Sequence, residues 1–131
     1  MKHAALPLVG MMFAGALAAS AAFAELVEVQ LQPGQSVDRQ FTAAPGKFVE
    51  VCGKLSKGQA LAWQFDASGP TDFNIHYHLG KDVKTPEQRS AVSAAKGQLL
   101  VQVKEDYCWM WINRGAAAVT IQTRIAAERQ P

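Results

Sequence analysis

The sequence contains few of the features that would narrow its function directly. It has only two cysteines in 131 residues, and charged residues make up 18% of the chain, with a formal net charge of +2. No block of basic or acidic residues stands out, so we expect neither a nucleic-acid partner nor binding to anionic membrane surfaces. No internal repeat or low-complexity tract divides the chain, and we therefore expect one domain.

Sequence motifs that mark enzymes are also missing. The chain has no nucleophile elbow, no glycine loop for phosphates, no zinc-protease motif and no paired-carboxylate signature. Catalytic groups can converge from distant strands, so an unrecognised enzyme stays an alternative. We predict a protein that is not an enzyme.

The first residues are typical of an export signal. A short basic start precedes an apolar run from Ala4 to Ala22, and an A-x-A pattern ends at Ala24. No cysteine for lipid attachment follows Ala24, and the start has no twin-arginine pair. We therefore expect a signal peptide over residues 1–24 and a single domain over residues 25–131, periplasmic or secreted, without a membrane anchor.

Alternation of apolar and polar residues predicts short strands along the rest of the chain. Turn residues separate these stretches, for example Pro33-Gly34 and Pro45-Gly46, where glycine suits the positive φ of a type II turn. About seven or eight such strands and no long amphipathic helix indicate an all-β fold. We expect an antiparallel β-sandwich of jelly-roll type, with a closed barrel as the alternative.

Two segments interrupt this pattern. The segment Asp66–Asp72 is rich in turn residues and predicts a turn. The segment Gly80–Lys96 carries several charges and a proline, so we expect a long surface loop with a short helical turn near residues 86–89.

The stretch Tyr107–Asn113 is predicted to be the central strand, because aromatic and β-branched side chains suit a pleated, half-buried surface. Its alternate side chains point to opposite faces. We expect the face with the cysteine to be core, so that the aromatic face points outward as a surface for a partner, unless a loop such as Gly80–Gln98 covers it. The aromatic set is Tyr107, Trp109 and Trp111, and the cysteine set is Cys108, Met110 and Ile112.

Cys52 and Cys108 are the only cysteines in the chain. In an exported protein two cysteines without competitors most simply form a disulfide, which would contribute about 4 kcal/mol to stability through the entropy of the unfolded chain. Two free thiols, or a thiolate that binds a metal, are the alternatives. Alternation over Phe48–Leu55 puts a charged Glu50 on the face of Cys52, although Gly53 suits a bulge that would change this register.

His76 and His78 are the candidate metal ligands. They alternate with the apolar residues of the most regular strand, Phe73–Leu79, whose apolar side chains we expect in the core, so both histidines should face outward together. Two such imidazoles can share a copper, nickel or zinc ion, and Met110 is a candidate thioether ligand that favours copper. In the alternative interpretation, the histidines are solvated and the methionine packs in the core with the cysteine set. Three carboxylates would suit a harder ion: Asp72, Asp82 and Glu105.

The chain contains, in order, Cys52 followed by Lys57-Gly58, then Trp63-Gln64-Phe65, Asp72-Phe73-Asn74-Ile75, and Tyr107-Cys108-Trp109 leading to Asn113. This order resembles the GOLD domain, the β-sandwich found in the lumenal part of cargo receptors and beside lipid-binding domains. The resemblance covers about residues 48–125. It implies a module that mediates interactions without catalytic residues, and a disulfide between the two cysteines. The coiled coil and membrane anchor of the cargo receptors have no counterpart in this sequence, so cargo sorting is not implied.

We therefore predict an exported, non-enzymatic binding module that uses the surface around His76, His78 and the strand over residues 107–113 to bind a protein partner. The alternative is a periplasmic copper-binding or copper-handling protein that uses the two histidines. Copper is the one cofactor that the residues suggest. The outward aromatic set leaves homodimerisation open.

Overall fold

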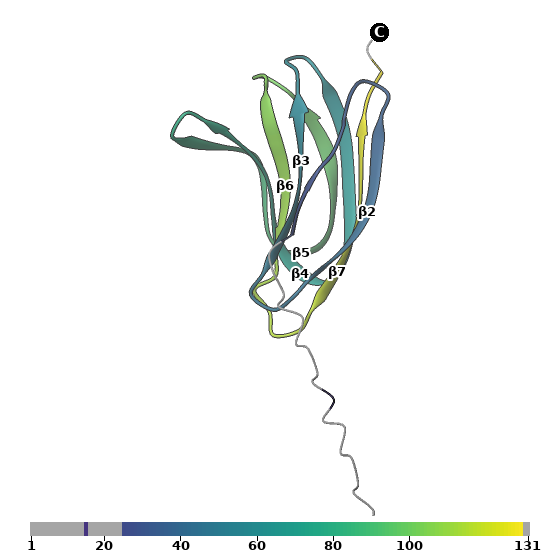
Figure 1. Cartoon of the computed structure of the whole chain (residues 1–131), viewed down its shortest axis with the longest axis vertical. Helices are drawn as coiled ribbons and strands as arrows, with labels where there is room; N and C mark the ends of the chain where they lie inside the picture. The colour runs from purple at the N-terminus through teal and green to yellow at the C-terminus, as the bar shows by residue number, and fades with distance from the viewer. Residues whose placement is uncertain (1–14, 16–24, 130–131) are drawn as a thin grey trace, which may run out of the picture.

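The structure, a computed structural model, describes residue 15 and residues 25–129. These residues form seven strands and no helix, which confirms the predicted all-β class (Figure 1). The predicted signal peptide falls outside the described residues, apart from Gly15, and stays a prediction. No helix in residues 25–129 has the length and apolar character needed to cross a membrane. The strands are β1 (Glu25–Glu28), β2 (Ser36–Ala43), β3 (Phe48–Leu55), β4 (Ala60–Leu79), β5 (Asp82–Leu100), β6 (Glu105–Ile112) and β7 (Val119–Ala127).

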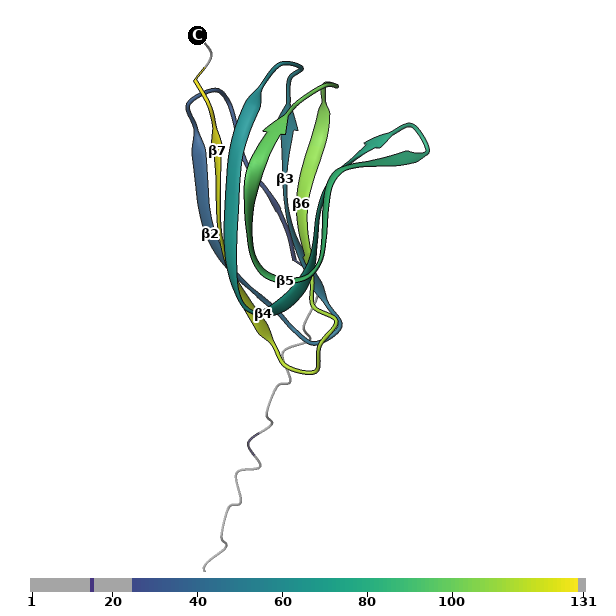
Figure 2. The same ribbon diagram turned by 180° about the vertical axis from the view of Figure 1, so that it is seen from behind.

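All seven strands belong to one sheet, which folds over on itself into two layers (Figure 1 and Figure 2). The long strands β4 and β5 form a hairpin that takes part in both layers. The first part of β4 pairs with β7 through Leu61–Ala67, and its second part pairs with β6 through Asp72–Tyr77. One layer continues from β7 to β2, and the other continues from β6 to β3 and β1. The sheet is antiparallel, as predicted, except that β1 and β3 pair in parallel.

The core lies between the two layers and consists of the inward-facing residues of each strand. Trp109 and Trp111 of β6 are completely buried there, and Phe73 of β4 packs with its ring centroid 5.4 Å from that of Trp111. Phe65, from the first part of β4, meets the same indole edge-on at 5.6 Å. Because each aromatic ring buries about 150–250 Å², these rings dominate the apolar contact between the layers. Other core side chains are Phe41, Val49, Val51, Leu61, Trp63, Ile75, Ile121 and Ile125.

The expected orientation of β6 is wrong. Tyr107, Trp109 and Trp111 point into the core, with exposures of 1%, 0% and 0%, whereas Cys108 and Met110 lie half-buried on the outer face. The prediction assumed that a disulfide must lie in the core. This disulfide instead joins directly paired residues of neighbouring strands, so it can form on the outer face of one layer. The larger aromatic rings of β6 then occupy the core. The predicted surface of three outward aromatic side chains therefore does not form.

The segment that was expected to be a loop is a strand. β5 pairs with β4 from Asp82 to Leu100, and no helical turn forms near residues 86–89. Most side chains of β5 are exposed, so its sequence shows no apolar alternation, and the pairing with β4 determines its conformation instead. The turn predicted over Asp66–Asp72 is also wrong, because β4 continues through it and the irregularity is absorbed as a shift in register against β5.

The two predicted Pro-Gly turns are confirmed. Gly34 and Gly46 have φ angles of 84° and 73°, in the left-handed region that glycine enters without a steric penalty. The first turn leads from the β1 segment into β2, and the second leads from β2 into β3.

Asn113 organises the connection between β6 and β7. Its side chain is completely buried, and its Nδ2 donates to the backbone carbonyls of Ala43 and Ala117 at 3.0 and 2.8 Å. Its Oδ1 accepts the backbone N–H of Gly115 at 2.9 Å. One buried amide therefore satisfies three backbone groups, and it ties the end of β2 to this connection.

We expect Asn113→Ala to lower the free energy of unfolding by about 3 kcal/mol, because it leaves these backbone groups without their partners. Arg114→Ala is the matched control, since the Arg114 side chain is 70% exposed and its ion pair with Asp72 should contribute less than about 1 kcal/mol. Urea unfolding followed by circular dichroism measures both values. Equal losses in the two variants would contradict the role assigned to Asn113.

Candidate functional site

The two histidines of β4 face away from the core, as predicted. Phe73 and Ile75 are 1% and 0% exposed, so alternation turns His76 and His78 to the outer face. The expectation that Leu79 is a core residue is wrong. It is 42% exposed, because the pairing of β4 with β6 ends at Tyr77.

The end of the β4–β5 hairpin extends beyond the sandwich. The last residue of β4 that pairs with β6 is Tyr77, whereas β4 and β5 stay paired as far as Leu79 and Asp82. Figure 1 shows this end of the hairpin projecting from the body. We call residues 78–84 the hairpin arm.

An open cleft of about 240 Å³ lies on the outer face at the base of the arm. His76 and His78 stand next to each other in this cleft, with ring centroids 5.6 Å apart and rings nearly perpendicular. Met110 reaches it from β6, where it is paired with Asn74 of β4. We call it the histidine cleft, and its lining residues are Asn74, His76, His78, Val83, Thr85, Gln88 and Met110.

Met110 is therefore not a core residue, contrary to the expectation that it packs with a buried Cys108. Because the indoles of β6 face inward, alternation turns Met110 outward into the cleft. The structure thus brings together the three candidate metal ligands, since His76 and His78 line the same cleft. The three candidate carboxylates lie elsewhere and do not line it: Asp72, Asp82 and Glu105.

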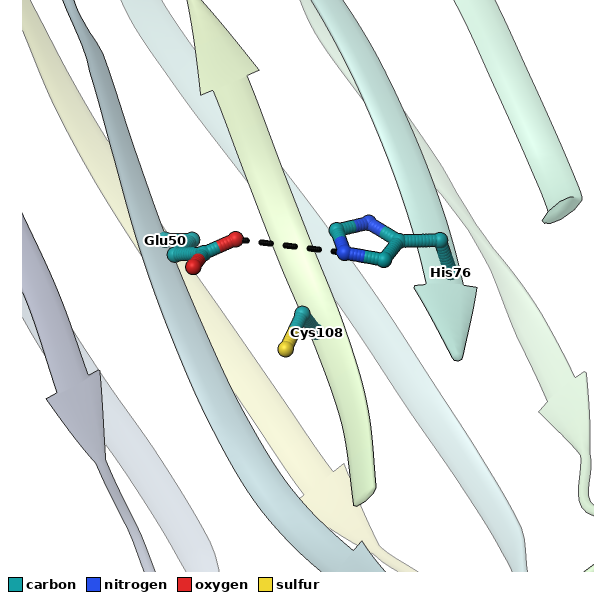
Figure 3. A group of neighbouring side chains, drawn as sticks. All are labelled: Glu50, His76 and Cys108. Atoms are coloured by element: carbon teal, nitrogen blue, oxygen red, sulfur yellow. Dashed lines mark ion pairs between the residues drawn. The ribbon is translucent and has the colours of Figure 1, made fainter. Parts of the chain in front are cut away.

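A carboxylate that sequence reasoning did not name as a ligand lies beside His76. Oε2 of Glu50, on β3, is 4.0 Å from Nε2 of His76, and the two side chains are only 13% and 11% exposed (Figure 3). The alternation of β3 did place Glu50 on the face of Cys52, and the pairing with β6 runs through Gly53 without a bulge. The sequence alone does not show the strand order, in which β6 lies between β3 and β4 and so brings Glu50 and His76 together.

Burial controls the charge of this pair. It raises the pKa of the Glu50 carboxyl above its usual value, an effect that His78 opposes and Glu28 strengthens. Burial also lowers the pKa of His76, and repulsion from His78 adds to this effect. The Glu50–His76 distance is too long for a hydrogen bond, and a neutral imidazole forms no salt bridge. His76 therefore faces Glu50 as a neutral group near pH 7.

Asn74 determines which nitrogen of His76 is free. Nδ1 of His76 donates to Oδ1 of Asn74 at 2.8 Å, which places the ring proton on Nδ1. The lone pair is then on Nε2, the nitrogen nearest to Glu50. Histidines that bind metals are commonly held in this way by a hydrogen bond to the second ring nitrogen.

Cys52 and Cys108 form the predicted disulfide, so neither is a free thiol. They are paired directly across β3 and β6, with 4.1 Å between their Cα atoms. On the other side of β6, Cys108 is paired with His76. In Figure 3 the imidazole of His76 and the carboxylate of Glu50 turn toward each other across Cys108.

Comparisons with known proteins identify the fold. No family model and no curated protein matches the sequence. PliG from Aeromonas hydrophila, a periplasmic lysozyme inhibitor of g-type lysozyme, aligns over 79% of this chain and 98% of that chain, with a TM-score of 0.57 and 14% identity. PliG from Salmonella Typhimurium covers the same shares, with a TM-score of 0.54 and 15% identity. The pre-peptidase C-terminal domain of a Bacillus anthracis collagenase aligns over 80% of this chain and 96% of that chain, with a TM-score of 0.56 and 6% identity. These likenesses confirm a small β domain, and the GOLD resemblance stays a prediction.

Glu50→Gln is expected to raise the thermal midpoint at pH 7 and to leave it nearly unchanged at pH 4. Folding raises the pKa of Glu50, so the stability linked to this group is present below its unfolded-state pKa and is lost as the pH rises through the folded value. A glutamine at position 50 carries no charge at either pH, so the variant does not lose this stability as the pH rises. The titratable groups around Glu50 are Glu28 on β1 and His76 and His78 on β4.

Calorimetry at the two pH values measures this difference. Glu28→Gln is the matched control, because it removes the same charge from an exposed position and should change the midpoint less. A rise of equal size at both pH values would contradict the assignment to the Glu50 carboxyl.

Proposed function

We propose that the protein is an exported, non-enzymatic module that binds a protein partner through the hairpin arm and the histidine cleft. The observation that carries this proposal is the exposure of two large apolar side chains on the arm. Leu79 is 42% exposed and Val83 is 56% exposed. A partner that covers these side chains would remove their apolar surface from water, which favours association.

The two apolar side chains lie on opposite faces of the arm. Val83 is paired with His78 and lines the cleft, whereas Leu79 follows Tyr77 on the other face. A two-stranded hairpin without cover is only marginally stable in water. A groove that admits the arm would cover both side chains. The arm carries two lysines, Lys81 and Lys84, and one aspartate, Asp82, and this excess of positive charge favours an acidic groove.

Export is supported by the disulfide, because such bonds persist in oxidising compartments. The PliG proteins, which share this fold, are periplasmic inhibitors of g-type lysozyme. A g-type lysozyme is therefore the first partner to test, with the arm entering its groove. The GOLD resemblance also implies interaction without catalysis.

The double variant Leu79→Ser/Val83→Ser is expected to weaken inhibition of a g-type lysozyme at least about tenfold, because the partner loses both apolar contacts. Leu100→Ser is the matched control, since Leu100 is 59% exposed at the opposite end of β5 from the arm and should leave inhibition unchanged. The rate at which cell-wall suspensions clear measures the inhibition.

Equal inhibition by the wild type and both variants would rule out the arm as the contact surface. No inhibition by the wild type would remove lysozyme as the partner. Crosslinking in periplasmic extract, with the same pair of variants, would then test the binding module itself.

Copper binding is the second candidate function, and one observation favours it. His76, His78 and Met110 come from two strands and line one cleft, with the two imidazoles side by side. Imidazole nitrogen is a common copper ligand, and the thioether of methionine suits Cu(I).

His76→Ala/His78→Ala is expected to abolish tight copper binding, because it removes both nitrogen ligands. Met110→Leu should weaken binding of Cu(I) more than binding of Cu(II), since the lost thioether is a soft ligand. Thr85→Ala is the control, because Thr85 lines the same cleft without offering a soft or imidazole ligand. Competition with a colorimetric copper chelator gives the affinities. An unchanged affinity in the double variant would eliminate this candidate.

A further inference from the structure

We propose that reduction of the Cys52–Cys108 disulfide creates a zinc site, with the two cysteine thiolates, Nε2 of His76 and the carboxylate of Glu50 as its four ligands. This site shares His76 with the histidine cleft, and so with the candidate copper site. It takes no ligand from the hairpin arm or from Met110.

The first support is geometric. The ligand atoms of Glu50, His76 and Cys108 all lie within 4.8 Å of one another, and Cys52 is bonded to Cys108. In a tetrahedral zinc site the ligands lie about 2.0–2.3 Å from the metal, so neighbouring ligand atoms are about 3.3–3.8 Å apart. Side-chain rotations that bring the atoms of Glu50, His76 and Cys108 closer by about 1–1.5 Å, together with separation of the two sulfurs after reduction, would give this spacing. The backbone of three paired strands already aligns the four residues.

The second support is the orientation of the two ligands other than cysteine. The hydrogen bond from Nδ1 of His76 to Asn74 leaves Nε2 with its lone pair on the side of Glu50 and Cys108. The Glu50 carboxylate turns toward the same point from β3, at a distance too long for a hydrogen bond to the imidazole (Figure 3). Nε2 of His76 and the carboxylate of Glu50 therefore face a common centre beside the sulfur of Cys108.

The chemistry requires a dithiol as reductant. The dithiol attacks the disulfide, the sulfur–sulfur bond breaks, the dithiol becomes a disulfide itself, and Cys52 and Cys108 each end with one proton. Zinc then replaces these two protons, which pass to water, and the resulting thiolates bind the metal. Before reduction the two sulfurs are bonded to each other and offer no thiolate. The disulfide therefore masks the site.

Zinc in this position would take over the structural role of the disulfide. Both links join β3 to β6 at the same pair of residues, and zinc would add a link to β4 through His76. Loss of the disulfide alone destabilises the fold, because the unfolded chain regains the freedom that the link had removed. A reduced chain is thus expected to keep its fold better with zinc than without it.

Cobalt(II) serves as the probe, because thiolate-bound tetrahedral cobalt has a charge-transfer absorption and visible bands that zinc lacks. The protein is reduced with a phosphine, which becomes the phosphine oxide with oxygen from water and offers no competing thiol. We expect one cobalt per reduced chain with the thiolate absorption, displacement of that cobalt by zinc, and no such absorption from the oxidised chain. Near-ultraviolet circular dichroism of the reduced, zinc-loaded chain should match that of the oxidised protein.

Variants separate this site from simple binding by thiols. In the reduced state, Glu50→Gln and His76→Asn should each weaken zinc binding at least about tenfold, and Asn74→Ala should weaken it about tenfold because it frees the imidazole. The control Met110→Leu removes the thioether ligand of the candidate copper site and should bind zinc like the reduced wild type.

Three results would overturn the proposal. The first is no cobalt absorption in the reduced wild type. The second is zinc affinity in the Glu50→Gln and His76→Asn variants equal to that of the reduced wild type. The third is a reduced chain that stays unfolded with zinc. Failure of copper binding together with success of this test would leave the masked site as the metal site of the protein.

Discussion

Burial of Trp109 and Trp111 between the two layers is the constraint on which the other arrangements depend. Both indoles lie on β6, the strand that pairs with β3 on one side and β4 on the other. Because successive side chains of a strand point to opposite faces, two inward indoles force the cysteine and methionine of β6 outward. The neighbouring strands then supply Glu50 and His76 to the same outer face. Core packing therefore brings Glu50 and His76 to the disulfide and forms the histidine cleft at the same time.

Alternation in the sequence predicted much of this, but it could not say which face of β6 is core. The outward histidines, the disulfide and the Pro-Gly turns are confirmed. The error at β6 came from placing a disulfide in the core, although Cys108 bridges a directly paired residue and needs no opposite layer. The areas of the two faces indicate the observed orientation, because the indoles of Trp109 and Trp111 bury far more apolar surface than Cys108 and Met110 do.

The parts that the sequence could not predict depend on contacts between distant segments. β5 has mostly exposed side chains, and its strand conformation comes from pairing with β4 over almost its whole length. The histidine cleft combines β4, β5 and β6, and Glu50 joins His76 from a strand two places away in the sheet. No window of sequence contains that arrangement, because strand order is decided by packing of the whole domain.

The buried tryptophans also make the protein an optical reporter of its own core. All three tryptophans of the chain, Trp63, Trp109 and Trp111, are at most 3% exposed, and none of their indole nitrogens has a hydrogen-bond partner among the described residues. Their native fluorescence therefore arises from dry, apolar surroundings and is emitted at short wavelength. Separation of the two layers would move the emission of all three indoles to longer wavelength together. Events confined to the outer face would leave the emission wavelength of the three indoles unchanged.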